Sequence, residues 1–164
     1  MHSVFSFCQW LEQTRAGTTI RDSGWLFQVI ETIHIFGIVA VMGSTSILDL
    51  RLMGLMLRDE PVSKLAGRYL LTWTWAGFAV MAVTGLLMFA SEATKLYGNL
   101  GFQIKMLLLV TAGVNAFVFD RLAYRSVGTW DDAPVAPLSA RIAGCLSLLL
   151  WFGIVAAGRW IAYV

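Results

Sequence analysis

Four side chains able to act as acid, base or ligand lie inside otherwise apolar stretches of the sequence. Glu31 and His34 fall in one stretch, Thr84 in a second and Lys105 in a third. Ionisable groups within an apolar span are costly, and they usually face the bundle interior and pair with one another. An imidazole can ligate a metal or haem iron, relay a proton, or hydrogen-bond within a core. These residues are therefore the first candidates for a site.

Helix geometry predicts that two of these groups lie at one height. Asp49 and Asp120 mark the expected boundary of the membrane. A helical rise of about 1.5 Å per residue puts His34 about 22 Å from Asp49. Lys105 lies at roughly the same height from Asp120. The two side chains therefore belong to one layer, in the half of the bundle away from that boundary.

Thr84, Gly85 and Glu31 complete the expected layer. Thr84 lies about 24 Å from the same boundary, and Gly85 leaves space beside it. Glu31 lies one turn beyond His34 and on the same helix face. One interpretation is an ion pair of Glu31 and Lys105, with His34 hydrogen-bonded to it, that only fixes helix register. The other is a small polar pocket that opens outward and binds a ligand, with His34 as a metal or haem ligand.

The composition places the whole chain in a bilayer. The chain has 164 residues, of which 58% are hydrophobic and 13% are charged, whereas soluble domains carry roughly 25% charged residues. Its mean hydropathy is +0.72 and its net charge is +2. These values exclude a disordered chain, a nucleic-acid binder and an ordinary soluble enzyme. The length suits one membrane domain, residues 1–164.

The apolar stretches predict an all-α integral membrane protein that forms a four-transmembrane-helix bundle. A span needs about 20 mostly apolar residues. The expected spans are residues 25–52, 69–91, 101–123 and 138–163. A short amphipathic helix, residues 3–15, is expected to lie in the membrane interface. Residues 18–23 are expected to form a polar connection into the first span.

Basic residues give the expected orientation. Seven Lys and Arg residues lie in or beside the two longer loops, and five lie on the other side. Since cytoplasmic loops carry an excess of Lys and Arg, we expect the longer loops in the cytoplasm and both termini outside.

Several chemistries are excluded by the motifs. The sequence has no glycine-rich phosphate loop, no G-x-S-x-G, no H-E-x-x-H and no C-x-x-C. Its two histidines are too few for a His-rich zinc site in one chain. They are also too few for two stacked haems with two His ligands each. The two cysteines imply no disulfide framework.

Other residues in the spans have structural interpretations. Cys145 is expected to be a small buried residue, and Asn115 to hydrogen-bond to a neighbouring helix. Trp73 and Trp75 are expected to be interface anchors that face lipid.

Three segments carry a resemblance to known families. They are WLFQVIETIHIFGIVAVMGSTSILDLRLMG at Trp25–Gly54, AVTGLLMF at Ala82–Phe89 and GFQIKMLLLVTAGVNAFVFD at Gly101–Asp120. Over nearly its whole length the chain resembles an uncharacterised family of small bacterial four-helix membrane proteins. It is more distantly similar to HemJ-type protoporphyrinogen oxidases and to the CopD copper-resistance membrane domain. The distant similarity rests on His34, on Thr84 with Gly85, and on Lys105.

The resemblance implies a location and a cofactor. HemJ-type proteins are associated with b-type haem, so a haem is expected near His34, which would be its axial ligand. Lys105 would pair with a propionate or with Glu31, and Thr84 and Gly85 would line the pocket. The expected location is the bacterial inner (cytoplasmic) membrane, with both termini periplasmic. Electrons would be exchanged with a quinone or a partner protein.

The sequence departs from the family pattern at one place. The third span of these proteins often ends in Phe-His, whereas this chain has Phe119 and Asp120 there. A second axial ligand would then be a Met, would be absent, or would be His34 of a second copy in a dimer.

Two alternatives stay open beside a haem protein. One is a non-enzymatic accessory or assembly subunit of a larger membrane complex, or a homo-oligomer, in which the polar layer only sets helix register. The other is a small transporter of protons, metal ions or solutes through this layer. The few polar groups expected in the other half of the bundle, Thr45 and Asn115, count against a transport path.

Overall fold

Four long helices dominate the computed structural model, which describes residues 2–163 and has no strand among them. The helices are α3 (Leu26–Leu52), α5 (Leu71–Ser91), α7 (Leu100–Leu122) and α8 (Leu138–Trp160). Each is long and apolar enough to cross a membrane. The predicted all-α fold with four transmembrane helices is confirmed, and the helix bounds lie close to the predicted ranges.

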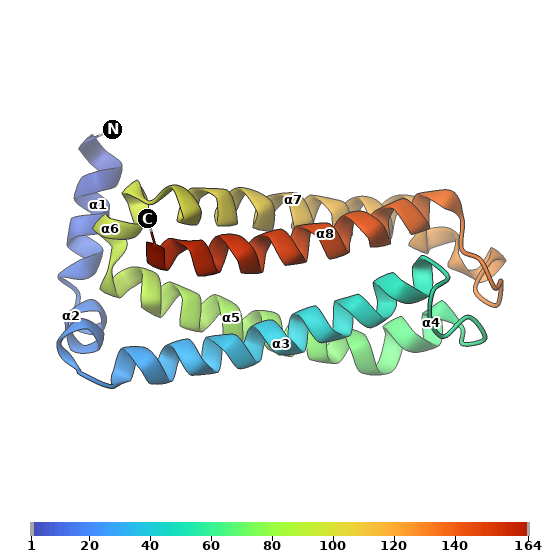
Figure 1. The fold of residues 1–164 in the computed structure, drawn as a ribbon, viewed down its shortest axis with the longest axis horizontal. Coiled ribbons are helices and arrows are strands. Elements are labelled where there is room, and N and C mark those ends of the chain that lie inside the picture. Colours follow the sequence, from blue (N-terminus) through green and yellow to red (C-terminus); the bar gives the residue numbers. More distant parts are fainter. Residues whose placement is uncertain (1, 164) are drawn as a thin grey trace.

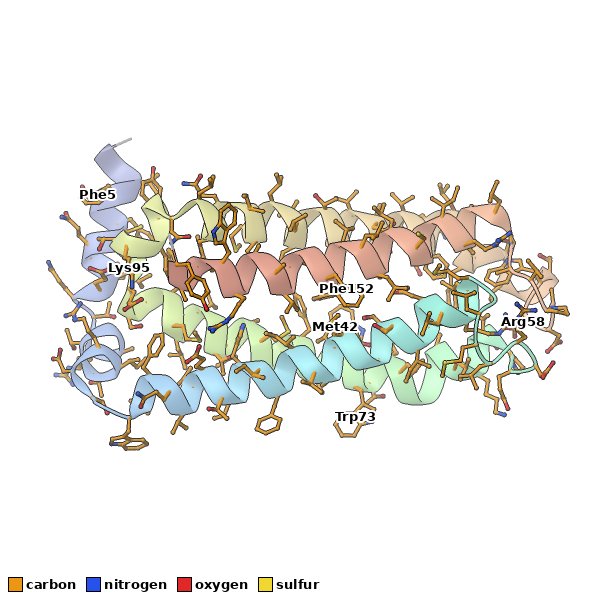
Figure 2. All side chains as sticks on the ribbon, in the orientation of Figure 1. Phe5, Met42, Arg58, Trp73, Lys95 and Phe152 are labelled. Atoms are coloured by element: carbon orange, nitrogen blue, oxygen red, sulfur yellow. The ribbon has the colours of Figure 1, made fainter. Side chains whose placement is uncertain are left out.

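The four helices form two hairpins that lie side by side (Figure 1). α3 packs along α5, α7 packs along α8, and α3 packs against α8 to join the hairpins. Both chain termini lie at one end of the bundle, here called the terminal end. The two longer loops lie at the opposite end, here called the loop end. Lys95 and Arg58 mark these two ends in Figure 2.

Glycines allow α3 and α5 to approach closely. A Cβ added at Gly77 would lie 2.9 Å from the Gly37 carbonyl oxygen and 2.9 Å from Val41. A Cβ at Gly37 would lie 2.9 Å from the Met81 side chain. Because α3 and α5 each carry a glycine where they cross, side chains of one helix pack directly against the backbone of the other.

Two short helices cover the terminal end. α1 (His2–Glu12) forms where a short N-terminal helix was expected, and its Glu12 carboxylate accepts hydrogen bonds of 2.8 Å from the backbone and the hydroxyl of Thr94. The polar connection expected at residues 18–23 is helical over most of its length, because α2 (Arg15–Asp22) forms there. The Thr14 hydroxyl caps α2, and Ile20 is buried. Packing of α2 against α5 therefore outweighs its polar composition.

The connection before α5 contains an unusual helical turn. A short helix, α4 (Val62–Leu65), runs into a π-helical stretch, η1 (Ala66–Leu70), before α5 begins. Two 3-10 turns, η2 (Tyr124–Thr129) and η3 (Ile161–Tyr163), follow α7 and α8. A last short helix, α6 (Ala93–Gly98), joins α5 to α7.

The buried Arg51 side chain connects the segments at the loop end. It is completely buried. Nε donates to the Glu60 carbonyl at 2.8 Å, and Nη2 donates to the carbonyls of Asp131 at 3.4 Å and Ala133 at 3.1 Å. One guanidinium thus connects the end of α3 to both loops, over an apolar cluster of Leu52, Val62, Ala123, Trp130, Ala136 and Ala140.

Three expectations for single residues can be compared with the structure. Asn115 donates a 3.0 Å hydrogen bond to the Ala143 carbonyl of α8, as predicted. Trp73 and Trp75 are exposed, and Trp73 points away from the bundle in Figure 2. The expectation for Cys145 is wrong, because this side chain is exposed on α8.

Candidate functional site

His34 and Thr84 join α3 to α5 in the half of the bundle nearer the terminal end. His34 Nδ1 lies 2.8 Å from the Thr84 hydroxyl oxygen. That hydroxyl also lies 2.6 Å from the Val80 carbonyl oxygen, to which it donates its one proton. The Thr84 oxygen therefore accepts the bond from His34, and the imidazole carries its proton on Nδ1.

This arrangement leaves His34 Nε2 as the basic nitrogen. The Nδ1 and Cε1 edge of the ring faces α5, since Cε1 would lie 3.3 Å and Nδ1 3.8 Å from a Cβ added at Gly85. Nε2 lies more than 4 Å from that Cβ. The Met81 backbone carbonyl is a second hydrogen-bond partner of the ring, and the hydrogen bonds among the described residues include none from Nε2. A ring held at Nδ1 with a free Nε2 is the arrangement seen in metal-ligating histidines.

Lys105 brings a positive charge to the same layer from the other hairpin. Its aliphatic chain and Nζ run along α8, where Nζ and Cδ would each lie 3.7 Å from a Cβ added at Gly158. The Lys105 charge acts electrostatically on the His34 ring. The side chain is half-buried and forms no salt bridge within the described part of the chain. The ammonium group is therefore available to an anionic partner.

Glu31 does not join this layer as expected. Its side chain is exposed, and the described residues include no ion pair between Glu31 and Lys105. The buried face of α3 passes through Ile30, His34 and Gly37. Glu31 is one residue further round the helix from Ile30 and so points away from α5 and α8. The prediction that Glu31 shares the face of His34 is therefore wrong.

Two polar features nearer the loop end were missed by the sequence interpretation. The hydroxyls of Ser44 and Thr74 lie 2.7 Å apart between α3 and α5. Asp49, which was expected to mark the membrane boundary, is only 5% exposed, and the nearby Arg51 is fully buried. The available signal for Ser44 was its spacing from His34 through Gly37 and Val41, which is the three- and four-residue spacing of a buried seam.

The donor set limits what this layer can hold. Within residues 2–163, no group of three or more His, Cys, Asp or Glu side chains could hold a metal ion. A metal here would receive one protein ligand from the layer, His34. An apolar hollow of about 350 Å³ lies beside Thr84, lined by Ile33, Ala79, Val80 and Val83.

The comparisons with known proteins give a family but no activity. No curated protein and no solved structure matches the sequence. A family described as "Family of unknown function (DUF6644)" matches residues 7–164, nearly the whole chain. The protein, a multi-pass membrane protein by its four apolar helices, belongs to the DUF6644 family.

Proposed function

We propose that the protein binds a redox cofactor, b-type haem, through His34 Nε2 and serves electron transfer or haem-related redox chemistry. The single observation that supports this is the hydrogen bond from His34 Nδ1 to Thr84, which orients the ring and leaves Nε2 free. Outer partners of this kind fix the tautomer and raise the basicity of a ligating histidine. The proposal places the protein in the bacterial inner membrane with periplasmic termini.

The donor set favours haem over a bare metal ion. A protein site for zinc or copper needs three or four side-chain ligands, and the described residues offer no such group. A porphyrin brings its own four equatorial nitrogens, so one histidine is enough to hold the iron axially. The residues present therefore fit haem.

Lys105, Thr84 and Gly85 have distinct parts in this proposal. Haem carries two carboxylates, and the Lys105 ammonium would pair with one of them in place of water. Thr84 would orient the His34 ring. Gly85 has no side chain, so the edge of the ring can pack against α5. When bound, haem supplies an iron that changes its charge by one electron. These side chains hold it and balance its charge.

Partners follow from the same chemistry. A membrane-bound one-electron centre needs a donor and an acceptor, for which we propose a quinone or a protein of a larger complex. A second copy of the chain would bring a second His34 to the iron. The absorption spectrum distinguishes one His34 ligand from two, because two strong-field axial ligands give a low-spin iron and one gives a high-spin iron.

The test is the absorption spectrum of the detergent-purified protein after expression with ample haem, oxidised and then reduced with dithionite. We expect a Soret band and reducible α and β bands in the wild type, and their loss in His34→Ala. Lys105→Gln should retain the bands with weaker haem binding. Thr111→Val is the matched control, because Thr111 is exposed and bonds only to the Leu107 carbonyl of its own helix. A colourless folded wild type would contradict the proposal and favour an accessory subunit.

A further inference from the structure

A buried carboxyl at the loop end has no charged partner. Asp49 is 5% exposed, and its Oδ2 atom is completely buried without a hydrogen-bond partner among the described residues. It lies on the side of α3 that meets α8, where a Cβ added at Gly144 would lie 3.0 Å from the Asp49 carbonyl oxygen. The contact is too close for side chains or a layer of water to separate the helices.

The groups around Asp49 are neutral or turned away. On α8 the Ser147 hydroxyl faces the carboxyl, while Arg141 and Cys145 are exposed and line a separate hollow with Met53. On α3 itself, Arg51 binds the loop carbonyls and forms no salt bridge with Asp49.

The remaining neighbours add no described charge. α5 has no charged residue from Leu71 to Ser91. The side chain of Arg68, in the π-helical stretch that packs against α3, lies outside the described side chains. The ion pairs among the described residues do not include Asp49.

We propose that Asp49 is a proton-binding site, in which the carboxyl takes a proton from water at the loop end and donates a hydrogen bond to the Ser147 hydroxyl. An uncompensated carboxylate in an apolar interior is costly, and it becomes neutral by binding a proton or a cation. One carboxyl and one hydroxyl supply far fewer oxygens than the six or more that Ca²⁺ or Mg²⁺ needs. The proton is therefore the ligand.

Such a site has a use that does not depend on haem. Ionisable carboxyls inside membrane bundles mark proton relays in pumps and transporters. Asp49 exchanges a proton at one end of the bundle, far along α3 from His34. The proposal thus assigns proton uptake to the loop end and stands whether or not His34 holds a cofactor.

The experiment is pH-difference infrared spectroscopy on the purified full-length protein, which detects the carbonyl stretch of a protonated carboxyl. Carboxyls in water ionise near pH 4, so a band that survives at about pH 6 and disappears on alkaline titration reports a buried acid. We expect this band in the wild type and its loss in Asp49→Asn. The matched controls are Asp120→Asn and Glu31→Gln, because both side chains are exposed on transmembrane helices.

Two results would overturn the proposal. The first is a wild type with no such band at any pH, and the second is a band that persists in folded Asp49→Asn. If Asp49→Asn does not fold, the Ser147→Ala variant tests the proposal instead. Loss of the hydrogen-bond acceptor should move the band to higher frequency, whereas an unchanged frequency would show that the protonated group is elsewhere.

Discussion

The two ends of the bundle use their polar groups differently. At the loop end, the Arg51 guanidinium binds three backbone carbonyls of two loops. In the other half, the hydrogen bonds of the His34 ring all go to α5, to Thr84 and the Met81 carbonyl, and Lys105 has no salt bridge in the described structure. Buried hydrogen bonds to a charged group stabilise a fold, whereas unpaired polar groups within a membrane mark function. The difference indicates that Arg51 maintains the structure of the loop end, whereas the His34 layer, like the unpartnered Asp49, is a place for binding.

The largest expected effect comes from breaking the loop end. Arg51→Met nearly keeps the side-chain volume but removes the guanidinium that donates to the three carbonyls. The free energy of unfolding should fall by about 3–5 kcal/mol. Thermal unfolding in detergent, followed by circular dichroism, measures this.

The control for Arg51 is another arginine of the loop end. Arg125 is exposed in η2, and Arg125→Met should change stability by less than about 0.5 kcal/mol. Equal stability of the two variants would show that the loop carbonyls do not depend on Arg51, and the contrast between the two ends would then fail.

A smaller effect on stability is expected in the His34 layer. Thr84→Val removes the acceptor of the His34 Nδ1 proton at nearly constant volume, and should lower the free energy of unfolding by only about 1 kcal/mol. The same change should weaken haem binding by about 10-fold, because the ring is no longer held. Haem titration and thermal unfolding of one preparation separate the two effects. Unchanged haem affinity would indicate that Thr84 does not position His34.

The smallest expected effect is a loss of folding stability at acidic pH, through Asp131 at the loop end. Burial raises the pKa of the Asp131 carboxyl, but hydrogen bonds from Ser63 and Val62 and the charge of Arg51 outweigh it and hold the pKa below its usual value. The Ser63 backbone N–H donates to Asp131 Oδ1 at 2.8 Å. Because the folded pKa is lowered, the stabilisation is complete above the unfolded pKa and is lost as the pH falls through the folded value.

The measurement is the melting temperature between about pH 6 and about pH 3, a window set by the normal carboxyl pKa near 4. The wild type should lose stability toward the acid end. Asp131→Asn should be less stable at pH 6 and should lose less on acidification. Parallel curves for the two proteins would contradict the assignment.

The spans and the approximate height of the polar layer were predictable, because both depend on local quantities, namely hydropathy and rise per residue. His34, Thr84 and Lys105 follow from them. The direction of Glu31 was not predictable, because it depends on which face of α3 meets α5 and α8. The burial of Asp49 and Arg51 was not predictable either. It results from two loops, distant in sequence, that fold over the end of α3, and charge alone suggested a boundary exposed to water.

The π-helical stretch Ala66–Leu70 has a consequence for how the chain length can vary. A π-turn holds one residue more than an α-turn, so this segment contains a residue that the helix does not need for its path. A chain lacking one residue there could continue α4 directly into α5 with ordinary helical hydrogen bonds, and Gly77 and Thr84 would keep their facing toward α3. Within α3, by contrast, deleting one residue between His34 and Arg51 would rotate the two parts of the helix relative to each other. His34 would then no longer face Thr84 while the end of α3 kept its packing. We therefore expect single-residue length differences among members of the family at residues 66–70 and not between His34 and Arg51.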